Sequence, residues 1–217
     1  MPKVHYSLGY IDLTKGKDEL FSRIRCRTEI RKAQKEGVRV TKIEGERKNE
    51  LKEKCVAMLK SLLAKEFVSY SKSFDILISD TNNYLFIAQV NGEIVSFIVV
   101  QPKANNPFDS KSKTAYLALS ATDDRFKGLC PNYLLIWEAC LYLMNRGYDY
   151  FNLGLLNYHE VSDKMLEKVA FFKRKWDVKE KTESEKISLA RYIYYRFFKN
   201  TLLVKKIVYR FNKYFNK

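Results

Sequence analysis

Histidine and closely spaced cysteines are scarce in this sequence. It holds two histidines, His5 and His159, and four cysteines, among which no C-x-x-C pair occurs. Structural zinc sites usually take their ligands from such closely spaced cysteines and histidines. The sequence therefore excludes a structural zinc site with the usual ligand spacing, and it leaves a histidine-dependent mechanism only two candidates.

Long apolar runs are also missing. No stretch of 18 apolar residues occurs, and the N-terminal segment has neither a seven-residue apolar core nor a small-residue cleavage site. Such features mark membrane spans and secretory signals. We therefore expect a cytoplasmic protein with free thiols.

Bulky apolar residues, by contrast, are plentiful. The 217 residues include 14 Phe, 15 Tyr and 2 Trp, and 46% of the chain is hydrophobic. A chain of this length hides roughly 70% of its unfolded surface on folding. The composition excludes disorder for most of the chain and predicts one large domain, with or without an appendage.

Positive charge is in excess. Lys and Arg number 40 against 25 Asp and Glu, which gives a net charge of +15. A surface of this kind attracts polyanions such as RNA, nucleotide phosphates or anionic lipid.

Much of this excess lies at the C-terminus. From Arg191 to Lys217 there are eight basic residues and no acidic residue, interleaved with aromatic and aliphatic ones. We divide the chain into a domain over residues 1–189 and a basic amphipathic helical tail over residues 190–217. The tail pattern favours binding to an anionic membrane surface, at the inner face of the membrane. Binding to RNA and packing against its own domain or an oligomer partner are the alternatives.

Periodicity predicts a mixed α/β sheet covered by helices. The strongest local signal is a β-hairpin, with strands over 84–90 and 93–101 joined by Asn91-Gly92, which suits a type I′ turn. A helix is expected from about Thr14 to Gly37. The other expected strands cover 4–13, 38–43, 114–121, 148–153 and 176–181, and the other expected helices cover 49–67, 131–145 and 163–172. Residues 68–82 are ambiguous. The sheet should hold six or seven strands.

Two stretches carry a resemblance to a known family. The first is R-T-E-I-R-K-A-Q-K-E-G-V over residues 27–38, and the second runs from P-N-Y-L-L-I-W-E over residues 131–138 to F-F-K-R-K-W over residues 171–176. They resemble the Fem family of aminoacyl-tRNA-dependent peptidyltransferases, which belong to the GNAT acyltransferase superfamily. One departure is Asn152-Leu153-Gly154, where the family has an acidic residue and a glycine.

The resemblance implies a fold, a reaction and partners. It implies a GNAT-like sheet and transfer of an aminoacyl group from aminoacyl-tRNA to an amine of a lipid-linked or nucleotide-linked peptidoglycan precursor, with no tightly bound cofactor. Family members have two GNAT-like halves, and this chain resembles the second. A partner protein or a second copy would then complete the substrate cleft. The alternatives are a coenzyme A dependent N-acyltransferase and a non-catalytic RNA- or membrane-binding module.

The resemblance also implies a role for Lys173, which matches the lysine of the family's F-K motif. It should stabilise charge near the reacting carbonyl or a substrate phosphate. The basic neighbours of Lys173 leave a solvated face as the alternative.

The segment between the strand at 114–121 and the helix at 131–145 fits a phosphate cradle, because free N–H groups gather before a helix. Its candidate residues are Arg125, Lys127, Gly128 and Asn132. The alternative is an ordinary exposed loop.

Five further residues have a chemical and a structural interpretation. Arg27 and Arg31 lie one helical turn apart and suit phosphate or RNA, or salt bridges with neighbouring carboxylates. Glu138, in a mostly apolar helix, suits a base with a raised pKa, or a structural hydrogen bond. Tyr158 and His159 follow the expected end of the strand at Gly154. Either could act as a general acid, and the alternative is that both lie in a surface loop.

Overall fold

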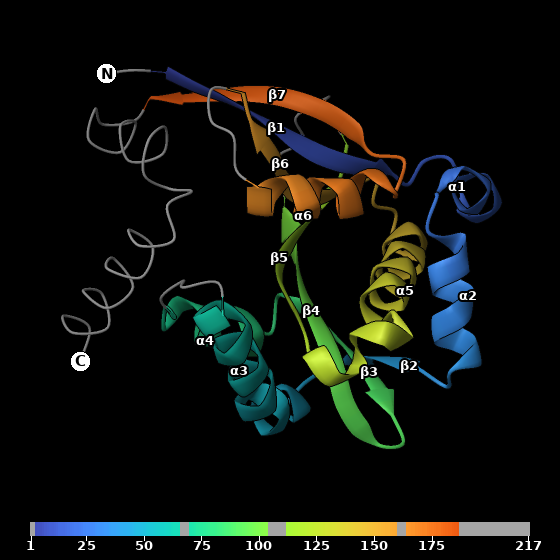
Figure 1. The fold of residues 1–217 in the computed structure, drawn as a ribbon, viewed down its shortest axis with the longest axis vertical. Coiled ribbons are helices and arrows are strands. Elements are labelled where there is room, and N and C mark those ends of the chain that lie inside the picture. Colours follow the sequence, from blue (N-terminus) through green and yellow to red (C-terminus); the bar gives the residue numbers. More distant parts are fainter. Residues whose placement is uncertain (1–2, 66–69, 104–111, 160–163, 187–217) are drawn as a thin grey trace.

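The structure is a computed structural model that describes residues 3–65, 70–103, 112–159 and 164–186. Within these ranges the chain forms one seven-stranded sheet in the order β2-β3-β4-β5-β6-β1-β7. The strands are β1 (Lys3–Asp12), β2 (Arg39–Ile43), β3 (Tyr84–Val90), β4 (Glu93–Lys103), β5 (Thr114–Thr122), β6 (Tyr150–Tyr158) and β7 (Lys179–Lys186). The helices are α1 (Lys17–Arg23), α2 (Arg27–Lys35), α3 (Arg47–Lys65), α4 (Ser73–Ser79), α5 (Pro131–Asn145) and α6 (Lys164–Arg174), with a 3-10 helix η1 (Asp124–Leu129) before α5 (Figure 1).

The mixed sheet and its central hairpin are confirmed. Strands β3 and β4 pair antiparallel from Tyr84 opposite Val100 to Val90 opposite Glu93. Asn91 and Gly92 have φ angles of 49° and 80°, the left-handed values that a type I′ turn needs. The hairpin forms because its turn residues and its alternating apolar strands favour the same local structure.

The single helix expected from Thr14 to Gly37 is wrong, because the structure divides it into α1 and α2. Ile24 is extended, with ψ at 143°, and the next N–H, that of Arg25, donates a hydrogen bond to the Lys175 carbonyl at 2.7 Å. The break leaves the side chains of Ile24 and Cys26 fully buried. A long-range contact thus overrides helical periodicity, and it fixes the start of α2 against the end of α6.

Two strands also differ from their expected ranges. Strand β6 begins at Tyr150 and runs to Tyr158, so Tyr158 belongs to the strand and does not follow its end. Strand β7 begins at Lys179, because Trp176 is fully buried and Asp177 turns the chain with a φ of 53°. Residues 68–82, which were ambiguous in the sequence, include helix α4.

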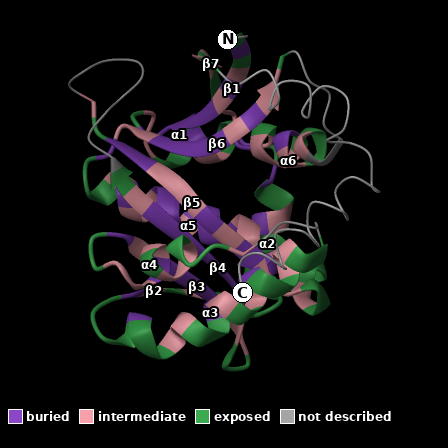
Figure 2. Ribbon diagram, turned by 90° about the vertical axis from the view of Figure 1, so that its left-hand side faces the viewer, coloured by how far each residue is buried: buried purple, intermediate pink, exposed green. Residues whose placement is uncertain are grey.

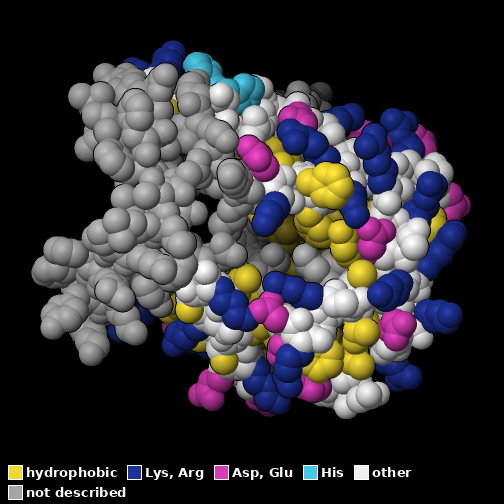
Figure 3. All heavy atoms as spheres, in the orientation of Figure 1, with side chains coloured by type: hydrophobic (Ala, Val, Ile, Leu, Met, Phe, Trp, Pro, Cys, Tyr) yellow, Lys and Arg dark blue, Asp and Glu magenta, His cyan; other side chains and the backbone are white. Residues whose placement is uncertain are grey.

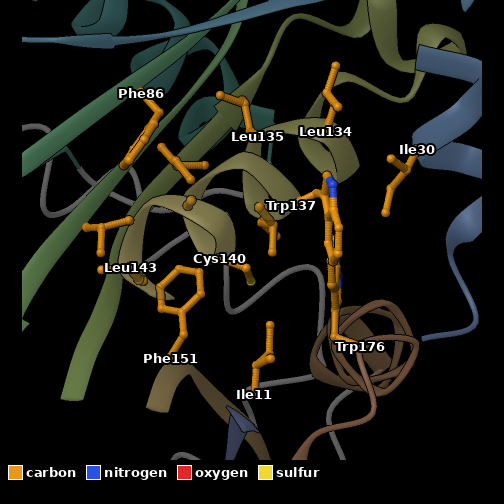
Figure 4. Packing of buried hydrophobic residues seen from close by; sticks show 14 of the residues in the cluster. Ile11, Ile30, Phe86, Leu134, Leu135, Trp137, Cys140, Leu143, Phe151 and Trp176 are labelled. Carbon is orange, nitrogen blue, oxygen red and sulfur yellow. The ribbon is translucent and has the colours of Figure 1, made fainter. Parts of the chain in front are cut away.

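Helices cover both faces of the sheet with separate cores. The larger core packs α1, α2 and α5 on the sheet and encloses Trp176 (Figure 4). The smaller core packs α3 and α4 against the other face. Buried residues accordingly line the strands, and exposed ones lie on the outer sides of the helices (Figure 2).

The C-terminal tail, residues 190–217, lies outside the described residues. In the part of the chain that the structure does describe, no helix is both long and apolar enough to cross a bilayer.

Candidate active site

The sheet opens between β5 and β6. These strands run parallel and pair only over Thr114–Tyr116 and Tyr150–Asn152. Beyond this point β5 pairs with β4 and β6 pairs with β1. The facing edges of β5 and β6 are therefore not paired with each other along most of their length.

A bulge in β6 lies beside this opening. The register between β1 and β6 shifts so that Gly9 faces Gly154 and Tyr10 faces Asn152. Gly154 has a φ of 83°, which L side chains rarely adopt, and its N–H donates a hydrogen bond to Asn152 Oδ1 at 2.6 Å. The glycine and the asparagine together hold the bulge in this shape.

Lys173 and Tyr116 converge on the open side of Gly154. A Cβ atom built on Gly154 would lie 3.6 Å from Lys173 Nζ and 3.6 Å from the Tyr116 hydroxyl oxygen. Lys173 Nζ also donates a hydrogen bond to the Leu155 carbonyl at 2.8 Å. An ammonium group has three N–H donors, so this contact leaves donors for a ligand.

Burial sets the electrostatics of this cluster. It lowers the pKa of Lys173 to about 8 and raises the pKa of Tyr116. No carboxylate of the described residues forms an ion pair with Lys173. At neutral pH the group remains mostly a cation in a poorly solvated place, where its field on a nearby oxyanion is strong.

The start of α5 lies next to the same opening. Tyr133 of α5 and Phe172 of α6 have ring centroids 4.9 Å apart, so α5 and the segment carrying Lys173 meet there. Asn132 Oδ1 is buried and has no hydrogen-bond partner among the described residues. Figure 3 shows this face hollowed below α6, with hydrophobic side chains in the wall and basic ones at the rim.

The expected phosphate cradle is η1, and its cations are already paired. Arg125 contacts Glu93 at 2.7 Å and Asp123 at 2.8 Å, and Lys127 pairs with Asp124. The carboxylate of Asp123 also accepts the Arg125 N–H at 2.9 Å. The segment thus supplies its own anions, although the space beside Gly128 is open.

These η1 residues also border a groove. It has a volume of about 530 Å³ and lies between α3, the start of β4 and the end of β5. Its floor is apolar, with Met58, Leu62 and Ile94, and charged residues such as Arg125 lie at its edge.

Arg27 and Arg31 are both exposed on α2. Arg27 donates a hydrogen bond to the Ser22 carbonyl, and Arg31 lies over the Phe21 ring at 5.6 Å. Glu29, one of the neighbouring carboxylates, pairs with Lys175 at 2.6 Å and not with either arginine.

Glu138, Tyr158 and His159 lie in other surroundings. Burial raises the pKa of the half-buried Glu138, and Lys17 of α1 opposes that rise. Tyr158 packs edge-on against Tyr6 and is four residues, or about 13 Å of strand, beyond Gly154. His159 Nε2 contacts Ser7 Oγ at 2.9 Å. The structure therefore does not bring Tyr158 to Lys173.

Metal-ligating residues do not gather in the described ranges. No group of three or more His, Cys, Asp or Glu side chains is placed there to hold a metal ion.

Comparisons with known proteins fit this geometry at the level of the fold. No family model and no curated sequence matches the chain. The crystal structure of FemX matches with a TM-score of 0.66 at 12% identity, over 86% of this chain and 63% of FemX. The chain has a GNAT-like fold.

Two further solved structures support the same fold. The C-terminal domain of a putative lysylphosphatidylglycerol synthetase from Agrobacterium fabrum matches with a TM-score of 0.58 at 16% identity, over 84% of this chain and 60% of that one. An aminoglycoside acetyltransferase from an uncultured soil metagenomic sample matches with a TM-score of 0.50 at 15% identity, over 70% and 96%. This chain thus spans less than two thirds of the length of FemX and of the synthetase domain.

Sequence reasoning missed Tyr116. Its strand was predicted, but nothing in one sequence shows that Tyr116 is the last residue of β5 to pair with β6, or that its side chain lies beside the bulge at Gly154. An aromatic residue with a hydroxyl in an otherwise small and apolar strand was the available signal.

Proposed function

We propose that this chain is an acyltransferase that moves an aminoacyl group from aminoacyl-tRNA to an amine of a cell-envelope precursor. The observation that carries this proposal is Lys173, a largely buried ammonium beside Gly154 where β5 and β6 separate. The GNAT-like fold supports acyl transfer, and the resemblance of residues 27–38 and 131–176 to the Fem family supports the tRNA donor.

The proposed reaction is aminolysis of an ester. The acceptor amine attacks the carbonyl carbon of the aminoacyl ester, a C–N bond forms, and the bond from carbon to the ribose oxygen breaks. The proton lost by the amine ends on the ribose hydroxyl that leaves. Lys173 donates a hydrogen bond to the oxyanion of the tetrahedral intermediate, a contribution of the kind that is worth about 10²–10³ in turnover.

The second candidate donor is acyl-coenzyme A, which the acetyltransferase fold favours. Pyrophosphate recognition at η1 would require Arg125 and Lys127 to exchange carboxylate partners for phosphate. This competition favours the tRNA donor, whose phosphates are spread along a strand and need no single cradle.

Recognition of the acceptor is proposed to need a second protein surface. The chain spans about 63% of FemX, and we propose that a second copy of this chain, which the purified protein supplies, completes an acceptor cleft of that size.

The test compares the donors directly. The purified chain is incubated with a nucleotide-linked peptidoglycan precursor and either a mixture of radiolabelled aminoacyl-tRNAs or acetyl-coenzyme A. We expect label on the precursor from aminoacyl-tRNA, and its loss in Lys173→Met. Transfer from acetyl-coenzyme A alone would overturn the tRNA donor, and equal turnover by Lys173→Met would overturn the role of Lys173.

A further inference from the structure

The outer face of α2 carries unpaired positive charge. Between residues 25 and 36, five exposed basic residues face solvent against one exposed acidic residue, Glu36. We call these five the α2 surface: Arg25, Arg27, Arg31, Lys32 and Lys35.

None of the five forms a salt bridge with a carboxylate of the described residues. The two basic residues of η1, Arg125 and Lys127, differ because each forms an ion pair with a carboxylate. Like charges crowded on one helix repel each other. A site that keeps them unpaired is suited to an external polyanion.

The α2 surface has a regular geometry. Arg27, Arg31 and Lys35 follow each other at four-residue spacing, which places them along one stripe at about 6 Å of axial rise per step. The opposite side of the helix, with Ile30 and Ala33, is buried against the core. The stripe is therefore held in place by packing and presents three cations in a row.

The N-terminal end of this surface lies near the candidate active site. Glu29 of α2 pairs with Lys175 at 2.6 Å, and the Arg25 N–H donates to the Lys175 carbonyl at 2.7 Å. Lys175 is two residues after Lys173. A strand lying along α2 therefore ends beside the helix that carries Lys173.

We infer that the α2 surface binds the phosphate backbone of the RNA donor and directs its 3′ end toward Lys173. This inference rests on the proposed function and adds the docking surface to it. A bilayer is disfavoured as the occupant, because interfacial helices insert apolar side chains and the apolar residues of α2 are already buried. Among the described residues, the large hydrophobic side chains that are strongly exposed are Ile76 and Phe171, and neither lies on α2.

The test measures the binding of labelled, uncharged tRNA by fluorescence anisotropy from 50 to 200 mM salt. Each phosphate contact contributes about 0.7 (single strand) to about 0.9 (duplex) to the slope of log K against log salt. The triple variant Arg27→Ala, Arg31→Ala, Lys35→Ala should lower that slope by about 2 to 3 and weaken binding on the order of 10²-fold at 0.1 M salt. The matched control Lys3→Ala, Arg47→Ala, Lys72→Ala removes three exposed cations that lie elsewhere, and it should leave the slope nearly unchanged.

Two results would overturn the inference: an unchanged slope for tRNA in the folded triple variant, whether or not its binding to vesicles of anionic lipid falls in a parallel assay, or an equal loss in the control. Thermal unfolding checks the fold first. If the triple variant does not fold, the double variant Arg31→Gln, Lys35→Gln should lower the slope by about 2 instead, and an unchanged slope there refutes the inference equally.

The two proposals fail separately. Because the tRNA is uncharged, binding does not depend on transfer. If the chain transfers from aminoacyl-tRNA but the triple variant binds tRNA as well as wild type does, only the proposed role of the α2 surface is refuted. If the α2 surface binds tRNA but transfer occurs from acetyl-coenzyme A alone, only the proposed tRNA donor is refuted.

Discussion

Replacing Lys173 by Met should stabilise the protein while it lowers the rate of transfer about 10²–10³-fold. Burial lowers the pKa of Lys173 from 10.5 to about 8, and one pKa unit corresponds to about 1.36 kcal/mol. The buried charge therefore destabilises the fold by at most about 3 kcal/mol at pH 7. Removing it forfeits the hydrogen bond to the Leu155 carbonyl, which is worth about 1 kcal/mol. The net expectation is a gain of about 2 kcal/mol in the free energy of unfolding, because Met is similarly long and unbranched.

The stability difference between Lys173→Met and the wild type should depend on pH. Between about pH 8 and 10.5 the unfolded chain keeps the Lys173 proton while the folded chain releases it, so wild-type stability rises with pH in that interval. Lys173→Met lacks this rise. The advantage of the variant should therefore be complete below pH 8 and shrink as the pH approaches 10.5.

Urea unfolding followed by the fluorescence of Trp137 and Trp176 measures the effect at pH 7 and pH 10. Lys168→Met, an exposed residue of the same helix, serves as the control and should change stability by less than about 0.5 kcal/mol. A loss of stability at pH 7 in Lys173→Met would refute the reasoning, because the lysine would then be a structural contact rather than a buried charge kept for function.

Three other predictions follow from the same structure. Gly154→Ala forces an L side chain to a φ of 83° and places its methyl group against Tyr116 and Lys173; we expect a stability loss of about 1–2 kcal/mol and a larger fall in turnover, whereas full turnover would show that the space is not used. The rate of transfer should decline above about pH 8 as Lys173 loses its proton, and a pH–rate profile without this limb would contradict an ammonium role. Truncation after Leu189 should abolish binding to anionic vesicles and leave a folded domain, and unfolding of the truncated chain would disprove an independent tail.

The sequence predicted the elements whose signals are local. The hairpin around Asn91-Gly92 and the helix beginning at Pro131 depend on neighbouring residues, and both were placed correctly. The break at Ile24 depends on a hydrogen bond from Arg25 to Lys175, 150 positions away, and helical periodicity does not encode it.

The candidate site follows the same division. Lys173 was singled out through its motif, yet its lowered pKa arises from burial beside Gly154, which only the folded chain creates. Tyr116 joins it because β5 and β6 separate just beyond that residue. The sequence offered Arg125 and Lys127 as phosphate-binding candidates, and the fold shows that each forms an ion pair with a nearby carboxylate, Asp123 or Asp124.

Asn152, the departure from the acidic residue of the Fem motif, is consistent with the role proposed for Lys173. Its Oδ1 atom accepts the Gly154 N–H at 2.6 Å, which is the hydrogen bond that an aspartate would make at this position. A carboxylate so close to Gly154 would attract the Lys173 proton, raise the pKa of the lysine and compete with an oxyanion for its N–H donors. The neutral amide supplies the same support to the bulge without that competition. The ammonium therefore keeps N–H donors free for the oxyanion, which stabilisation of the transition state requires.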